Sequence, residues 1–305
     1  MSRTGNAFRE YEVAEGWAKV PSSIQLGYTH GIETDSAGNV YVFHTNKPSV
    51  VKFDRDGHYL SSWGDEYEEG AHGFLLSREG GQEFFYLTDI RGTVVKTTLD
   101  GEKLLTIATP DLPGVYDEER LFRPTDVAVA PNGDIYVADG YGQSYIHQYD
   151  SAGTRIRSWG GSGTEPGKLN CPHGISVDLR GDEPELYVAD RGNHRIQVFT
   201  LDGEHKRFID ENMDMPCNFY YYGDELVFPD LNSRVTIFDR RDKLIAHLGE
   251  DQQAYKQPGW PNLPPDYFRD NRFSSPHGVC VDAEGNVLVA EWTQYGRITK
   301  LIRVK

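Results

Sequence analysis

The sequence has few cysteines and no long apolar run, and both shortages limit what the protein can be. Its three cysteines, Cys171, Cys217 and Cys280, are too few and odd in number for a disulfide framework. No apolar stretch approaches the ~20 residues that a membrane span needs. The N-terminal segment MSRTGNAFREYEVAEG lacks the apolar core of a secretory signal. We therefore expect a cytoplasmic protein with reduced thiols and no membrane partner.

Positive charge and helical periodicity are also scarce. The chain has 31 Lys and Arg against 47 Asp and Glu, which gives a net charge of -16. Such a surface repels a phosphate backbone, so a nucleic acid is excluded as a partner. No stretch sustains the apolar spacing of a helix, whereas short alternating apolar runs separated by Gly, Asn and Asp are frequent, which predicts an all-β protein.

A short phrase recurs along the chain roughly every 40–60 residues, a spacing typical of β-propeller blades. It begins with His-Gly or a substitute, followed by an apolar run, a turn and two further runs. The first position of the phrase, called here the slot, is occupied by His30, His72, Asp126, His173, Asn218 and His277. Six phrases predict a six-bladed propeller, and a closed ring of repeats predicts one domain spanning residues 1–305.

The last phrase ends at Lys305 after three strands, one fewer than a complete blade needs. The strand-like segment at residues 11–20 precedes the first phrase. We expect this segment to become the fourth strand of the last blade and so to close the ring, which removes an exposed sheet edge.

The slots open the innermost strands, so they share one face with the residues that follow each second strand. Those following residues are Thr45, Ile90, Tyr141, Arg191, Leu231 and Trp292. His72, His173 and His277 belong to alternate blades, so their imidazoles should converge on the channel axis. Three histidines with an open fourth position are the ligand set of a catalytic zinc or a similar divalent ion. A single such histidine could equally cap its strand, and His30 could be a ligand, a substrate contact or an acid/base.

One stretch carries a resemblance to a known family. Residues 123–199, with the phrases "DGYGQS", "CPHGISVD" and "VADRGNHRIQVF", resemble the catalytic domain of peptidyl-α-hydroxyglycine α-amidating lyase, an NHL-repeat six-bladed propeller. The resemblance implies that His72, His173 and His277 bind zinc. It further implies that Tyr141 is the catalytic base and that Arg191 faces the substrate.

The sequence also departs from that family. Thr45, with Lys47 nearby, stands where the lyase has a further catalytic arginine, Gly278 replaces an aspartate that helps to hold a structural calcium, and Gly142 replaces a disulfide cysteine. These departures argue against a structural calcium ion and leave the choice between a small molecule and a short peptide as substrate open.

The three slot histidines predict a metal-dependent enzyme, and the resemblance implies that it is a lyase acting on a hydroxylated or carboxylated substrate, with Tyr141, Arg191 and His30 as catalytic groups. Thr45, Lys47 and Trp292 are expected to contact the substrate, together with Trp260 from the proline- and aromatic-rich insertion at 250–273. A metal-dependent hydrolase of the lactonase type and a non-enzymatic propeller that binds proteins are the alternatives. We expect a monomer or a small homo-oligomer.

Overall fold

The computed structural model describes residues 2–304, and its chain forms two compact units. The first unit comprises residues 1–69 and 212–305, and the second comprises residues 70–211. Strands dominate both units, and the helical elements in the described part of the chain are short 3-10 turns. No helix within residues 2–304 is long and apolar enough to cross a membrane.

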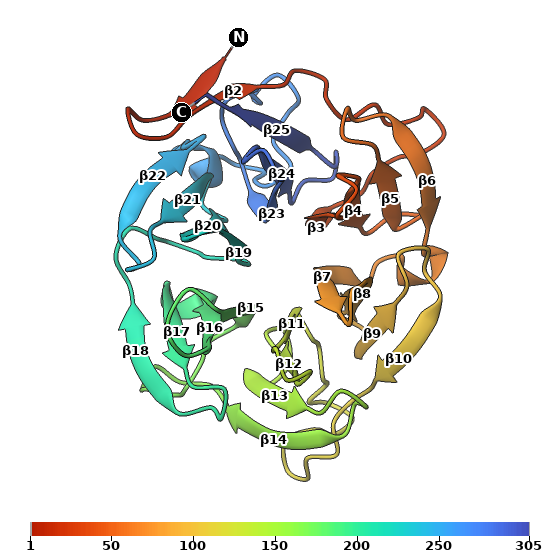
Figure 1. Ribbon diagram of the computed structural model, residues 1–305, viewed down its shortest axis with the longest axis vertical. Coiled ribbons are helices and arrows are strands. Elements are labelled where there is room, and N and C mark those ends of the chain that lie inside the picture. The colour runs from red at the N-terminus through yellow and green to blue at the C-terminus, as the bar shows by residue number, and fades with distance from the viewer. Residues whose placement is uncertain (1, 305) are drawn as a thin grey trace. The chain divides into compact units, whose positions relative to one another are not determined.

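The first unit holds three antiparallel sheets, with strand orders β3-β4-β5-β6, β19-β20-β21-β22 and β1-β2-β25-β24-β23 (Figure 1). Its elements are β1 (Arg3–Gly5), β2 (Glu10–Val13), β3 (Thr29–Thr34), β4 (Val40–His44), β5 (Val50–Phe53), β6 (Tyr59–Trp63), η1 (Asp65–Tyr67), β19 (Tyr220–Tyr222), β20 (Glu225–Asp230), β21 (Arg234–Phe238), β22 (Leu244–Leu248), η3 (Ala254–Lys256), β23 (Pro276–Val281), β24 (Val287–Glu291) and β25 (Ile298–Arg303).

The second unit also holds three antiparallel sheets, with strand orders β7-β8-β9-β10, β11-β12-β13-β14 and β15-β16-β17-β18. Its elements are β7 (Ala71–Glu79), β8 (Gln82–Asp89), β9 (Thr93–Thr97), β10 (Lys103–Ile107), β11 (Asp126–Val129), β12 (Ile135–Ala138), β13 (Tyr145–Tyr149), β14 (Arg155–Gly160), β15 (Pro172–Asp178), β16 (Glu185–Asp190), η2 (Arg191–Asn193), β17 (Arg195–Phe199) and β18 (His205–Ile209).

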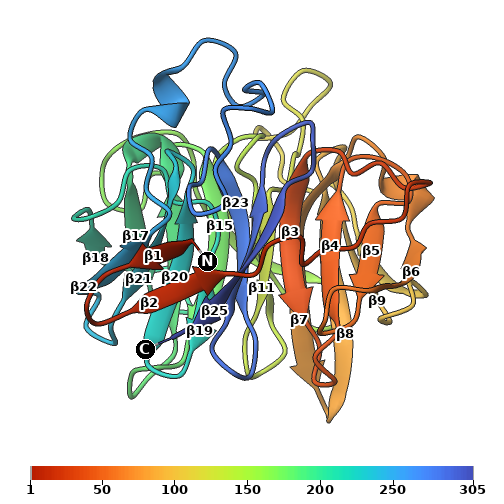
Figure 2. The same ribbon diagram turned by 90° about the horizontal axis from the view of Figure 1, so that it is seen from above.

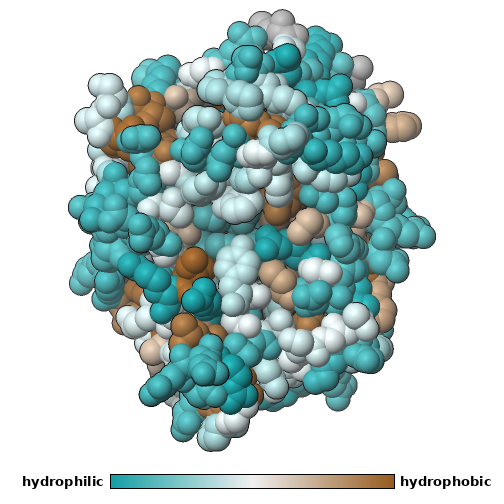
Figure 3. Space-filling model, turned by 180° about the vertical axis from the view of Figure 1, so that it is seen from behind, coloured by the Kyte–Doolittle hydropathy of each residue, from teal (hydrophilic) through white to brown (hydrophobic). Residues whose placement is uncertain are grey.

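These six sheets are the six predicted blades, and the all-β propeller fold class is confirmed. The hydrophobic core lies between neighbouring blades. In the second unit, for example, Tyr136 of blade three packs in one buried cluster with Val188 and Phe199 of blade four. The outermost strands are more exposed than the second and third: β14 has no buried residue, whereas all four residues of β12 are buried. Figure 3 shows hydrophilic residues over most of one face, in keeping with the net charge of -16.

The N-terminal segment completes the last blade as predicted, although with a shorter strand. β2 pairs antiparallel with β25, Tyr11 opposite Arg303, and β1 adds an unpredicted fifth strand outside it (Figure 2). Residues 14–20 do not continue the strand, because the chain turns at Gly16, whose φ is 61°. Trp17 instead lies buried in the first unit beside Phe53 and donates its indole N–H to the carbonyl of Arg55. The extent predicted for the strand, residues 11–20, was therefore wrong at its C-terminal end.

Candidate active site and metal centre

The four slot histidines lie where the ladder between the first and second strands is irregular. The register shifts between Thr29 and Gly31 in β3 and between Ala71 and Phe74 in β7. It shifts again between Pro172 and Ile175 in β15 and between Pro276 and Gly278 in β23. A β-bulge re-aims the side chain at its unpaired position. Each histidine is thus freed from the regular alternation of its strand, whereas Asp126 in blade three pairs regularly with Ala138.

The glycine after the histidine is required by close packing between neighbouring first strands. A Cβ atom on Gly73 would lie 2.6 Å from the carbonyl oxygen of Thr125, and one on Gly278 would lie 2.6 Å from that of His30. Neither backbone oxygen can move without displacing its strand. Close packing therefore explains the glycine at these positions of the recurring His-Gly pair. It does not explain the histidine.

Two of these histidines use one ring nitrogen in the same way. His72 Nδ1 lies 2.7 Å from the carbonyl oxygen of Thr125, and His277 Nδ1 lies 3.0 Å from that of His30. A carbonyl oxygen only accepts, so Nδ1 carries the proton and Nε2 keeps its lone pair. Metal-binding histidines are typically oriented by such a bond from the second ring nitrogen. Both residues therefore have the tautomer that an Nε2 ligand needs.

Tyr141 lies between the two slot histidines of the second unit. Its hydroxyl oxygen is 3.1 Å from His72 Nε2 and 3.1 Å from His173 Nε2, and the two imidazole centroids are 4.8 Å apart. Tyr141 is the most exposed of the three, at 37% against 2% for His72 and 1% for His173. The arrangement points two imidazole nitrogens at one phenol oxygen that solvent can reach.

Arg191 approaches the same hydroxyl from the turn after β16. Its Nη2 lies 3.4 Å from the Tyr141 oxygen, and its guanidinium carbon is 5.6 Å from the centre of the Tyr141 ring. The same Nη2 is 3.4 Å from the sulfur of Cys171. Cys171, Cys217 and Cys280 are all free thiols, as predicted. The second unit thus brings together four of the predicted site residues: His72, His173, Tyr141 and Arg191.

Burial keeps the imidazole of His72 neutral and raises the pKa of the carboxyl group in the next slot. Desolvation lowers the pKa of His72 to about 3, so this ring stays an electron-pair donor throughout the physiological pH range. Desolvation also raises the pKa of Asp126 to about 7. The Asp126 carboxylate accepts the backbone N–H of Ile175 at 3.1 Å, so it joins two neighbouring blades. This structural role explains why an aspartate rather than a histidine occupies the slot of blade three.

The first unit places the other predicted residues near one another. The rings of His30 and His277 meet edge to face with centroids 4.6 Å apart. Trp292 contacts Tyr28 at 5.6 Å and Trp260 at 5.9 Å between ring centroids. The insertion that carries Trp260 projects beyond the strand ends between β22 and β23 (Figure 2). Trp260 donates its indole N–H to the carbonyl of Ser274, which holds the insertion against β23.

Thr45 and Lys47, the predicted substrate contacts after β4, already have partners within the first unit. The Thr45 hydroxyl accepts the backbone N–H of Tyr28 at 3.1 Å. Lys47 forms an exposed ion pair with Glu68 at 2.6 Å. Their role toward a substrate stays a prediction.

Comparison with known proteins supports the resemblance that the sequence suggested. The NHL repeat family model matches residues 123–148 and 169–199. NHL repeat-containing protein 3 of Homo sapiens is 31% identical over 203 residues, which cover 63% of this chain and 57% of that protein. Peptidyl-alpha-hydroxyglycine alpha-amidating lyase 1 of Drosophila melanogaster is 27% identical over 322 residues, covering 88% and 56%. The predicted resemblance is confirmed. The chain spans just over half the length of these two relatives.

Solved structures of low sequence identity agree on the fold. A streptogramin B lyase matches with a TM-score of 0.63 and 15% identity over 98% of both chains. A gluconolactonase of Xanthomonas campestris matches with a TM-score of 0.61 and 15% identity over 92% of this chain and 87% of its own. At such identities the likeness concerns the propeller alone.

Proposed function

We propose that the protein is a metal-dependent lyase that cleaves the C–N bond of a carbinolamide, with zinc or another first-row divalent ion bound by His72, His173 and His277. The observation that supports it best is the Tyr141 hydroxyl, 3.1 Å from the Nε2 atoms of both His72 and His173. The similarity to amidating lyases over 88% of the chain points to the same reaction class.

Two of the three proposed ligands are oriented for an ion. Nδ1 of both His72 and His277 is directed at a backbone carbonyl, which leaves Nε2 for coordination. The low pKa of His72 means that no proton competes for that nitrogen near neutral pH. When bound, a divalent ion would polarise a substrate oxygen as a Lewis acid.

Tyr141 then acts as the base. Its phenolate takes the proton from the hydroxyl on the carbon that bears the nitrogen. The electron pair of that O–H bond forms the carbonyl, and the pair of the C–N bond leaves with the nitrogen. Tyr141 returns the proton to the nitrogen, so an amide and an aldehyde result, and the enzyme is unchanged. Arg191, 3.4 Å from the Tyr141 oxygen, suits a carboxylate on the same carbon, because a guanidinium binds carboxylates through two parallel hydrogen bonds.

The test combines metal content with product release. Protein purified without added metal should contain one divalent ion per chain and release glyoxylate from N-acyl-α-hydroxyglycines. His72→Ala, His173→Ala and His277→Ala should each lose the ion, whereas His58→Ala, which changes an exposed histidine on the first blade, should keep it. Full metal in the triple variant would overturn the site. Metal-loaded protein that hydrolyses lactones and releases no glyoxylate would establish the hydrolase instead.

A further inference from the structure

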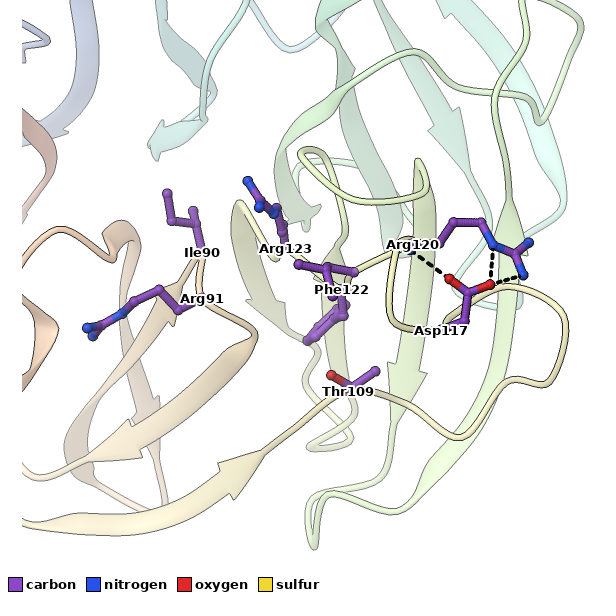
Figure 4. A pocket seen from close by; sticks show the side chains of 8 residues that line it. Ile90, Arg91, Thr109, Asp117, Arg120, Phe122 and Arg123 are labelled. Carbon is purple, nitrogen blue, oxygen red and sulfur yellow. Dashed lines mark hydrogen bonds and ion pairs between the residues drawn. The ribbon is translucent and has the colours of Figure 1, made fainter.

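A cavity in the second unit is lined by residues that the proposed site does not use. The cavity has a volume of about 360 Å³ and lies between the turn after β8 and the insertion at residues 109–122 (Figure 4). It is called here the Arg123 pocket, and its lining residues are Ile90, Arg91, Thr109, Asp117, Arg120, Leu121, Phe122 and Arg123.

Two of its three arginines are already neutralised. Arg91 donates to both carboxylate oxygens of Asp89, and its Nε lies 2.9 Å from Oδ1. Arg120 donates to Asp117 through Nε at 2.8 Å and Nη2 at 2.6 Å, as the dashed lines in Figure 4 show. Arg123 is exposed, and across residues 2–304 no carboxylate lies within ion-pair distance of its guanidinium. The pocket therefore has one cation available to a ligand.

The backbone of Arg123 is bonded to the loop that carries Tyr141. The carbonyl of Arg123 accepts the N–H of Tyr141 at 3.3 Å, and its own N–H donates to Asp139 Oδ1 at 2.7 Å. Ile90, which follows β8 as Tyr141 follows β12, lines the same pocket. Two backbone hydrogen bonds thus fix the position of Arg123 relative to the loop that carries Tyr141, within the second unit.

The rest of the lining is mostly apolar, with Thr109 as a polar member, and partly rigid. Phe122 is 2% exposed and is held edge to face by Tyr116 at 5.8 Å and His147 at 5.7 Å between centroids. Ile90 and Leu121 add aliphatic surface. Figure 4 shows Ile90 and Arg123 projecting toward the same side, away from the Arg120–Asp117 pair. Such a lining suits a short aliphatic chain that ends in an anion.

We propose that the Arg123 pocket binds the acyl part of the substrate and selects acyl chains that end in a carboxylate. The inference rests on the proposed function, because that function supplies the scissile bond at Tyr141. One planar guanidinium matches a carboxylate through two parallel bonds. A phosphate carries about -1.5 to -2 charges, which a single unpaired arginine does not offset in a chain of net charge -16.

Equilibrium binding of stable glycine analogues tests this without turnover. We would titrate metal-loaded protein calorimetrically with N-glutarylglycine and N-pentanoylglycine, which share the glycine carboxylate and differ at the acyl end. The wild type should bind the glutaryl compound roughly 2–5-fold more tightly, the usual gain from one charge-assisted contact at an exposed site. Arg123→Gln should abolish that difference. Arg157→Gln, which changes an arginine of β14 outside the pocket, should preserve it.

The outcomes separate this proposal from the previous one. Equal affinities in the wild type, or a preference that survives Arg123→Gln, would overturn the pocket assignment even if glyoxylate is released from hydroxylated substrates. An Arg123-dependent preference in protein that releases no glyoxylate would uphold the pocket and overturn the lyase. Tighter binding of the matching phosphonate, N-(4-phosphonobutanoyl)glycine, would overturn the carboxylate assignment.

Discussion

Blades three and four each have a buried aspartate at the turn that follows the second strand, called here the corner, but different side chains stabilise it. Each second strand leads into a buried aspartate whose Oδ1 accepts a backbone N–H from the segment before the first strand. Asp139 accepts that of Arg123 at 2.7 Å, and Asp190 accepts that of Asn170 at 2.7 Å. Tyr141 follows Asp139 by two residues and Arg191 follows Asp190 directly. The contacts of these two acids show that they hold the turns that carry the candidate site.

The two corners differ in how the carboxylate is compensated. Arg195 lies opposite Asp190 in the β16–β17 ladder and donates to it at 2.7 Å. Arg234 and Arg297 do the same for Asp230 and Glu291 in the first unit. In blade three the residue opposite the aspartate is Tyr145, whose carbonyl accepts the backbone N–H of Asp139. Tyr145 carries no positive charge.

Asp139 instead receives the hydroxyl of Tyr116, which the insertion at 109–122 contributes at 2.7 Å. Burial raises the pKa of the Tyr116 hydroxyl, so it stays protonated and donates. His147 Nε2, 2.6 Å from the Tyr116 oxygen, must then donate to that oxygen, and His147 Nδ1 accepts from Ser158 Oγ at 2.8 Å. Without a cation, burial raises the pKa of Asp139 to about 6. The loop of Tyr141 therefore depends on a carboxylate that titrates close to neutral pH.

The largest expected difference between the corners is in catalysis. Tyr141→Phe keeps the ring between His72 and His173 but removes the ionisable hydroxyl, so turnover should fall by ~10²–10⁴-fold while metal content and fold persist. Arg191→Gln removes a substrate contact rather than the base, so KM should rise more than turnover falls. Steady-state kinetics with N-acyl-α-hydroxyglycines would measure both. Equal turnover in wild type and Tyr141→Phe would remove Tyr141 from the reaction.

The next largest effect is on stability and concerns blade four. Arg195→Gln leaves the fully buried carboxylate of Asp190 without its cation, which should cost about 3–5 kcal/mol in the free energy of unfolding. Arg78→Gln breaks an exposed pair with Glu83 and should cost about 0–1 kcal/mol. Denaturant titration would compare the two. If the buried pair costs no more than the exposed one, the arginine does not hold the corner.

The sequence predicted the parts of the site that depend on repetition. The aligned slots and strand ends identified His72, His173, Tyr141 and Arg191, and the structure brings these four together, because every blade places equivalent positions alike. It did not reveal Tyr116 or Arg123. Tyr116 reaches Asp139 across 23 residues from an insertion that lies outside the recurring phrases, so no periodic pattern marks it. Likewise, the turn at Gly16 ended the closing strand where alternation alone suggested that it would continue.

A smaller effect should follow from loosening the blade-three corner. Tyr116→Phe removes one of three donors to Asp139 and leaves His147 Nε2 without its acceptor, which should cost about 1–3 kcal/mol in unfolding free energy. Because the Tyr141 loop loses support, turnover should also fall, while the metal stays bound. Tyr59→Phe, which changes a partly exposed tyrosine on β6, is the control and should alter neither. Unchanged stability in Tyr116→Phe would show that the insertion is not anchored there.

The smallest expected effect comes from converting blade three to the pattern of blade four. Tyr145→Arg places a guanidinium opposite Asp139, as Arg195 lies opposite Asp190, and the added positive charge should lower the pKa of Asp139 from about 6. The shift will be partial, because burial keeps the pKa of Asp230 raised even beside Arg234.

The pH dependence of stability measures this shift. The folded pKa of Asp139 lies above its ordinary value of 3.8, so the folded state binds more protons than the unfolded state between those values. This group's contribution to stability is therefore lost as the pH rises from 3.8 to about 6. Tyr145→Arg should therefore reduce the loss of stability over that window relative to Tyr145→Phe, which keeps the ring without the charge. The acidic limb of the curve of turnover against pH should move to lower pH in the arginine variant alone. Metal content would be checked at each pH. The same limb in both variants would mean that Asp139 does not control the Tyr141 loop.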